Sequence, residues 1–314
     1  MAVDRSLEVL DGRCDDDGHP RRTGTPWTCS AHIITAVIGA GVLSLAWAVA
    51  QLGWVAGPAC MLCFALVTYV SAALLTECYR RGDPDKGPRN HCYMDAVRVY
   101  LGKKHTWACG SLQYVSLYGC GVAYTITTAT SIRAILKSNC YHDHGHDAAC
   151  NYDGSYYMLI FGGAQLFLSF IPDFHDMAWL SVYSQPIFQF VDKFFAERYP
   201  DSGFVNDFHT VKAPCLPACR VNLLRVSFRT LYVASTTVVA IVFPYFNEVL
   251  ALLGALNFWP LAIYFPVEMY FIQRNVQKWS TRWVVLQTFS VVCLLVSAFA
   301  LVGSIEGLIS QKLG

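Results

Sequence analysis

The sequence predicts an all-α polytopic membrane protein with about seven transmembrane helices, and three observations support this. The 314 residues are 54% hydrophobic and only 14% charged, whereas a soluble domain carries about 25% charge. Several apolar stretches reach the length of about 20 residues that a helix needs to cross a bilayer. Lysine and arginine gather in alternate connecting segments, as the positive-inside rule requires.

The chain begins with a polar tail, residues 1–26, which lacks the apolar core of a cleavable signal peptide. Its low apolar content predicts a disordered segment on the cytoplasmic side. The domain that crosses the membrane should cover residues 27–310. Its predicted spans are residues 31–50, 54–76, 107–136, 155–171, 226–243, 249–272 and 283–305.

A pair of glycines lies in the middle of the first span, within the run Ile38, Gly39, Ala40, Gly41 and Val42. Each glycine costs a helix about 1 kcal/mol relative to alanine. In lipid, a loosened helix is tolerated only where the freed backbone groups face protein, water or a ligand. The pair is therefore either a packing notch or a break. We favour a break that holds a small polar solute.

The third span should be a central helix. Tyr114 and Tyr118 carry polar groups that need partners within the bundle, and Gly119 and Gly121 allow neighbouring helices to approach closely.

The sixth span carries two prolines and a carboxylate. Pro260 and Pro266 should distort its helix, because proline lacks the N–H of a helical hydrogen bond. Glu268 either relays protons or pairs with a neighbour near the membrane surface, and we favour pairing. The same two interpretations apply to Glu77, Arg133 and Glu306.

Two connecting segments have helical patterns. Residues 93–101 form either a helix lying on the membrane or an ordinary solvated helix. Residues 177–196 make a poor span, because they include Asp192 and Pro186. We expect an amphipathic helix at 187–197 and then a loop containing Pro200, Pro214 and Pro217.

Basic residues assign the orientation. With seven spans and a cytoplasmic N-terminus, they concentrate on one side of the membrane, and the C-terminus lies outside. The residues that set this orientation are Arg21, Arg22, Arg80, Arg81, Lys86, Arg89, Arg98, Lys103, Lys104, Lys193, Arg198, Lys212, Arg220, Arg225, Arg274, Lys278 and Arg282.

The loop after the third span then lies outside, where oxidising conditions allow Cys140 and Cys150 to form a disulfide. Between them, three alternating histidines and two aspartates could bind zinc or sense pH. Alternating histidines have no recognised ligand spacing, so we favour a solvated polar loop and expect no metal.

Several long strings resemble plant amino acid permeases of the amino acid/auxin permease family. They are residues 38–47 (IGAGVLSLAW), 171–175 (IPDFH), 182–188 (VYSQPIF), 243–247 (FPYFN), 253–260 (LGALNFWP) and 264–270 (YFPVEMY). The resemblance extends over almost the whole chain after residue 21.

The resemblance implies a leucine-transporter-like fold with inverted repeats and a broken first helix. Backbone groups of Ile38, Gly39, Ala40, Gly41 and Val42 would meet the substrate. Tyr114 and Tyr118 are weaker candidates for the opposite wall.

The chain also departs from the family, whose members have eleven spans. Residues 177–181 resemble the start of the fifth span and residues 182–186 the end of the eighth, so the join falls near 181/182. The absent sixth span is the inverted-repeat partner of the first. We therefore expect a truncated version of the fold, with transport impaired in the monomer.

The resemblance implies proton-coupled amino acid import across the plasma membrane, with amino acids and the lipid bilayer as partners and no cofactor beyond the coupling proton. The alternative is a truncated, non-transporting isoform that binds or modulates full-length permeases. A seven-span receptor would need its N-terminus outside. No nucleophile–base set lies at membrane depth, so we expect no enzyme, and the net charge of +1 gives no indication of nucleic acid.

Overall fold

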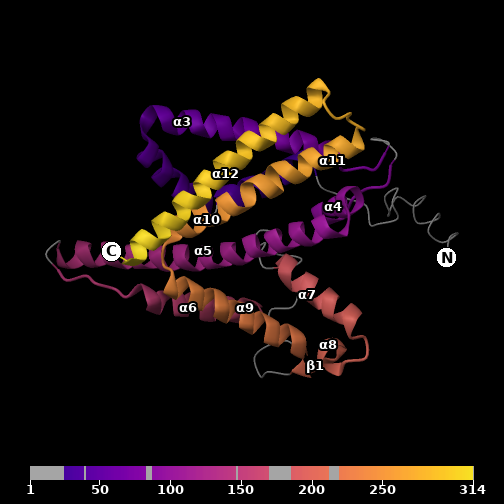
Figure 1. The fold of residues 1–314 in the computed structure, drawn as a ribbon. Coiled ribbons are helices and arrows are strands. Elements are labelled where there is room, and N and C mark those ends of the chain that lie inside the picture. Colours follow the sequence, from indigo (N-terminus) through magenta and orange to yellow (C-terminus); the bar gives the residue numbers. More distant parts are fainter. Residues whose placement is uncertain are drawn as a thin grey trace. The chain divides into compact units, whose positions relative to one another are not determined.

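The computed structural model describes residues 25–38, 40–82, 87–145, 148–169, 185–211 and 219–313. Most of the polar tail, Gly39 and the join at 181/182 lie outside these residues. Helices dominate the described part (Figure 1). They are α2 (Pro26–Ile38), α3 (Ala40–Glu77), α4 (Tyr93–Leu101), α5 (Lys103–His144), α6 (Gly154–Ser169), α7 (Gln185–Arg198), α8 (Gly203–Asn206), α9 (Leu223–Val242), α10 (Phe246–Asn257), the π-helix η3 (Phe258–Tyr264), α11 (Phe265–Gln273) and α12 (Thr281–Leu313).

Within the described residues, four helical stretches are long and apolar enough to cross a membrane. They are Ser44–Glu77, Leu223–Val242, Phe246–Gln273 and Thr281–Gln311, and they fall on the predicted second, fifth, sixth and seventh spans. The predicted first, third and fourth spans fall on α2 with the start of α3, on α5, and on α6. The all-α membrane class is thus confirmed, and the number of spans is confirmed in part.

The turn expected between the first two spans is confirmed as a kink within α3, because Gly53 has φ 81° and ψ 176°, outside the helical range. Helix bounds differ from the prediction at the end of the third span. α5 continues past residue 136 into the segment predicted as a loop. It ends before Gly145, whose φ of 80° stops the helix and whose N–H donates to the Tyr141 carbonyl at 3.0 Å.

A small antiparallel ladder replaces part of the loop predicted after residue 197. β1 (Phe208–Val211) pairs with β2 (Cys219–Asn222), so that Phe208 lies opposite Asn222. The Asn222 amide donates to the carbonyls of Val205 and Asp207, at 2.6 and 3.1 Å. These hydrogen bonds stabilise the end of the ladder at which Phe208 pairs with Asn222. The prolines of this segment did not predict the ladder.

The chain forms two compact units. The first comprises Met1–Ser111 with Leu256–Phe299, and the second Leu112–Ala255 with Ala300–Gly314.

In the first unit, α11 is the central element. One buried cluster joins it to α3, η3 and α12 through Leu74, Ile263, Val267, Phe271 and Cys293.

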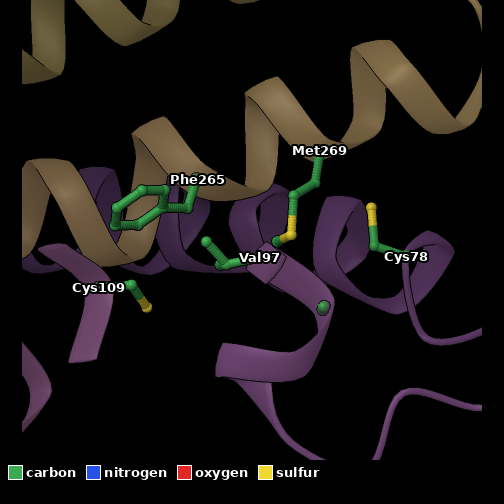
Figure 2. Packing of buried hydrophobic residues seen from close by; sticks show 6 residues of the cluster. Cys78, Val97, Cys109, Phe265 and Met269 are labelled. Atoms are coloured by element: carbon green, nitrogen blue, oxygen red, sulfur yellow. The ribbon is translucent and has the colours of Figure 1, made fainter. Parts of the chain in front are cut away.

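A second cluster in the same unit packs α4 onto α11. It contains Val97 from α4 and Phe265 and Met269 from α11, with Cys78 and Cys109 at its two ends (Figure 2). Val97 is fully buried. The helix predicted at residues 93–101 is confirmed, and protein covers its apolar face. Its position relative to the membrane stays a prediction.

In the second unit, small residues bring helices together. A Cβ added to Gly121 would lie 2.9 Å from the Tyr232 hydroxyl, and one added to Gly119 would overlap Leu253. The close approach predicted for the third span is thus confirmed. α6 packs on α9 in the same way, because Gly162 lies directly against Thr237.

Candidate functional site

The glycine pair of the first span is described only in part. The described helical residues extend to Ile38 in α2 and continue from Ala40 in α3, which includes Gly41 and Val42. Gly39 lies outside the described residues. The proposed role of these five residues in binding substrate stays a prediction.

The two tyrosines named as the opposite wall belong to an aromatic cluster of the second unit. Tyr118 on α5 meets Tyr232 on α9 edge to face, with ring centroids 5.7 Å apart. Tyr232 in turn lies 5.3 Å from the ring of Phe188 on α7, and Tyr114 packs against the same group. The cluster therefore gathers rings from three helices. Its possible contact with substrate also stays a prediction.

Charged groups that the sequence did not single out as site residues lie beside this cluster. The Arg225 Nε atom is 2.9 Å from Asp192 Oδ2, and the Arg229 guanidinium lies 5.3 Å from the centroid of the Phe188 ring. Burial raises the pKa of the Asp192 carboxyl, while Arg225 and Arg229 oppose that shift.

One signal in the sequence could have revealed this arrangement. Phe188 and Asp192 are four residues apart on one helix, and Arg225 and Arg229 are four apart on another. Residues at that spacing share a helix face. When two such helix faces pack together, the Asp192–Arg225 ion pair and the contact of Arg229 with the Phe188 ring form side by side.

The distortion predicted for the sixth span is confirmed as the π-helix η3, which contains Pro260. From this segment the Trp259 indole N–H donates to the Ser290 carbonyl of α12, at 3.0 Å. The Tyr264 hydroxyl lies 3.4 Å from Nε2 of His105. π-Helical segments occur frequently at functional sites.

Glu268 follows Tyr264 by one helical turn and is half-buried. His105 and Lys278 are basic side chains that interact electrostatically with it. This environment is compatible with both interpretations of Glu268, as a proton relay or as a paired charge.

At the far end of α5, a disulfide joins Cys140 to Cys150, with Cα atoms 6.0 Å apart. His142 and Asp143 lie between them, largely exposed, with Nδ1 and Oδ1 3.5 Å apart. Among the described residues, no three histidine, cysteine, aspartate or glutamate side chains gather as a metal site would require.

The chain matches the family model for "Transmembrane amino acid transporter protein" in two segments, residues 22–185 and 180–310. It is 37% identical to "Probable amino acid permease 7" of Arabidopsis thaliana, over 95% of this chain and 96% of the relative. The identity is 37% with "Amino acid permease 8" (95% and 94%) and 36% with "Amino acid permease 2" (93% and 89%), both from the same plant.

The class is thus a polytopic helical membrane transporter and not an enzyme. The chain belongs to the transmembrane amino acid transporter family, as the resemblance predicted. No solved structure matches it.

The alignments also reveal what the chain lacks. The first one extends over 447 positions, whereas the chain has 314 residues, so at least 133 positions of the alignment have no residue here. The two family-model segments meet at residues 180–185, and the sequence predicts the join at 181/182. These data fit a truncated member of the family.

Proposed function

We propose that this protein imports amino acids together with protons across the plasma membrane. The observation that carries the proposal is the family match, because it covers both sides of the join and 95% of the chain in the alignment to a permease. The N-terminus would lie in the cytoplasm and the C-terminus outside.

The substrate would bind at the break of the first span. Backbone N–H groups between Ile38 and Val42 would face its carboxylate, since helix ends carry unpaired donors and a partial positive charge. The glycine pair Gly39 and Gly41 supports this assignment, because each glycine weakens a helix by about 1 kcal/mol relative to alanine.

Uptake in a transport-deficient yeast tests the proposal. The tagged chain is compared with empty vector for labelled amino acid uptake at acidic and neutral pH, with surface protein measured in parallel. A Gly41→Leu variant should abolish uptake at equal surface level. Gly163→Ala is its matched control, because open space surrounds Gly163. A surface-localised chain without uptake at either pH would contradict the proposal.

The missing positions favour a second candidate, a non-transporting form that binds and modulates full-length permeases. A broken helix without its repeat partner exposes backbone groups in lipid, and a full-length relative could satisfy them. This candidate predicts co-purification with a full-length permease and altered uptake by that permease. Uptake by the short chain alone, with no co-purification, would contradict it.

A further inference from the structure

The sixth span contains two neighbouring carbonyl groups that its own helix cannot satisfy in the regular way. The Phe265 N–H donates to the Pro260 carbonyl, which is the i→i−5 pattern of a π-helix. The next donor in line is residue 266. It would bond Leu261 in the π pattern or Ala262 in the α pattern, but Pro266 has no N–H.

Hydroxyl groups from two other helices occupy these positions. The Tyr93 hydroxyl of α4 donates to the Leu261 carbonyl at 2.6 Å. The Ser71 hydroxyl of α3 donates to the Ala262 carbonyl. Burial raises the pKa of Tyr93, so its hydroxyl keeps the proton that it donates. The two hydroxyl groups thus stabilise, from outside the span, the point where π-helix η3 gives way to α-helix α11.

α4 is attached to the same span at its other end. The Tyr100 hydroxyl donates to Oε1 of Gln273, the last residue of α11, at 2.7 Å. Gln273 Nε2 in turn donates to the Arg80 carbonyl at 3.1 Å. Between the two tyrosines, Val97 is buried against Met269 and Phe265 (Figure 2).

We infer that α4 and the π-helical segment of the sixth span form one conformational element, in which Tyr93 is the positioning residue. When α4 is docked, the Leu261 carbonyl has its donor and the π geometry persists. When α4 leaves, that carbonyl is buried without a partner, and the segment changes its hydrogen bonding. A protein or a modification that displaces α4 would in this way change the conformation of a helix that crosses the membrane.

The protein carries its own reporters of α4 docking. Cys78 and Cys109 are buried at the two ends of the contact between α4 and α11, whereas Cys29 is exposed. Burial raises the pKa of the Cys78 thiol to about 12, so it reacts slowly while α4 covers it. Alkylation rates of these cysteines, read by mass spectrometry, report on α4 independently of transport.

The experiment uses the full chain in lipid nanodiscs and two readouts. The first is alkylation of Cys78 and Cys109, with Cys29 as internal reference. The second is amide hydrogen exchange of residues 258–265. Tyr93→Phe should raise both rates by about fivefold or more, because loss of one buried hydrogen bond costs about 1 kcal/mol. Tyr79→Phe, an exposed tyrosine before α4, is the matched control and should change neither.

Tyr100→Phe separates a coupled element from a local contact. Tyr100 contacts Gln273 and Arg80 rather than η3, yet coupling requires that its loss also accelerate exchange at residues 258–265. Faster alkylation without faster exchange at 258–265 would overturn the inference, and so would unchanged rates in both variants. If Tyr93→Phe does not fold, the exchange result for Tyr100→Phe alone decides.

Discussion

The two units of this protein hold their polar groups in different ways. In the first, hydroxyl groups of Tyr93 and Ser71 satisfy backbone carbonyls that Pro266 leaves open. In the second, a disulfide closes the end of α5, and the half-buried Asp192 pairs with Arg225. Hydroxyl-to-carbonyl bonds respond to neither redox conditions nor pH below about 10. The comparison therefore predicts that reductant acts on the disulfide of the second unit, whereas removal of a neutral donor acts on these carbonyls of the first.

The largest effect expected in the second unit is loss of the disulfide. Cys140→Ser should destabilise the segment from 140 to 150 by about 2–3 kcal/mol, because a short closed loop constrains the unfolded chain. Limited proteolysis and hydrogen exchange at these residues measure this. Reductant should reproduce the effect in the unmodified protein and leave exchange in α11 unchanged. Equal protection with and without reductant would contradict the prediction.

The sequence predicts features that depend on local chemistry. Pro260 and Pro266 predict a distorted sixth span, and π-helix η3 is found there. Gly119 and Gly121 predict close helix packing, and a Cβ at either would meet a neighbouring side chain. In each case the residue itself limits the backbone or the space around it, so no distant partner needs to be known.

Features that depend on distant partners were not predictable. Tyr93 and Leu261 are 168 positions apart, and their hydrogen bond follows from tertiary packing alone. The same holds for Asp192 with Arg225. α5 runs beyond its predicted end at 136 because hydropathy falls there while no helix breaker occurs before Gly145. Hydropathy indicates which residues lie in the membrane, but it does not indicate where a helix ends.

In the first unit, Ser71→Ala should lower the free energy of unfolding by about 1–3 kcal/mol, because it leaves the Ala262 carbonyl buried without this donor. The loss should be the same at every pH between acidic and neutral. Thermal unfolding in detergent at several pH values measures it. Ser30→Ala, at an exposed serine of α2 in the same unit, serves as the comparison variant. A loss that varies with pH would remove the contrast between the two units.

The smallest expected effect concerns Asp192. Burial outweighs the two arginines and raises the pKa of this carboxyl above the ordinary aspartate value of 3.8. A folded-state pKa above the unfolded one means that the folded protein binds the proton more tightly. The contribution to stability is therefore present below pH 3.8 and is lost as the pH rises through the folded-state pKa.

Asp192→Asn removes that titration. At neutral pH it should change the free energy of unfolding by less than about 1 kcal/mol, since a partly exposed ion pair roughly offsets its own desolvation. In the unmodified protein, this carboxyl should lower the free energy of unfolding as the pH rises above 3.8. In Asp192→Asn that decrease should be absent. A loss of several kcal/mol at neutral pH would instead mean that the Asp192–Arg225 pair stabilises α7 against α9. The second unit would then depend on its ion pair as strongly as the first depends on its hydroxyl donors.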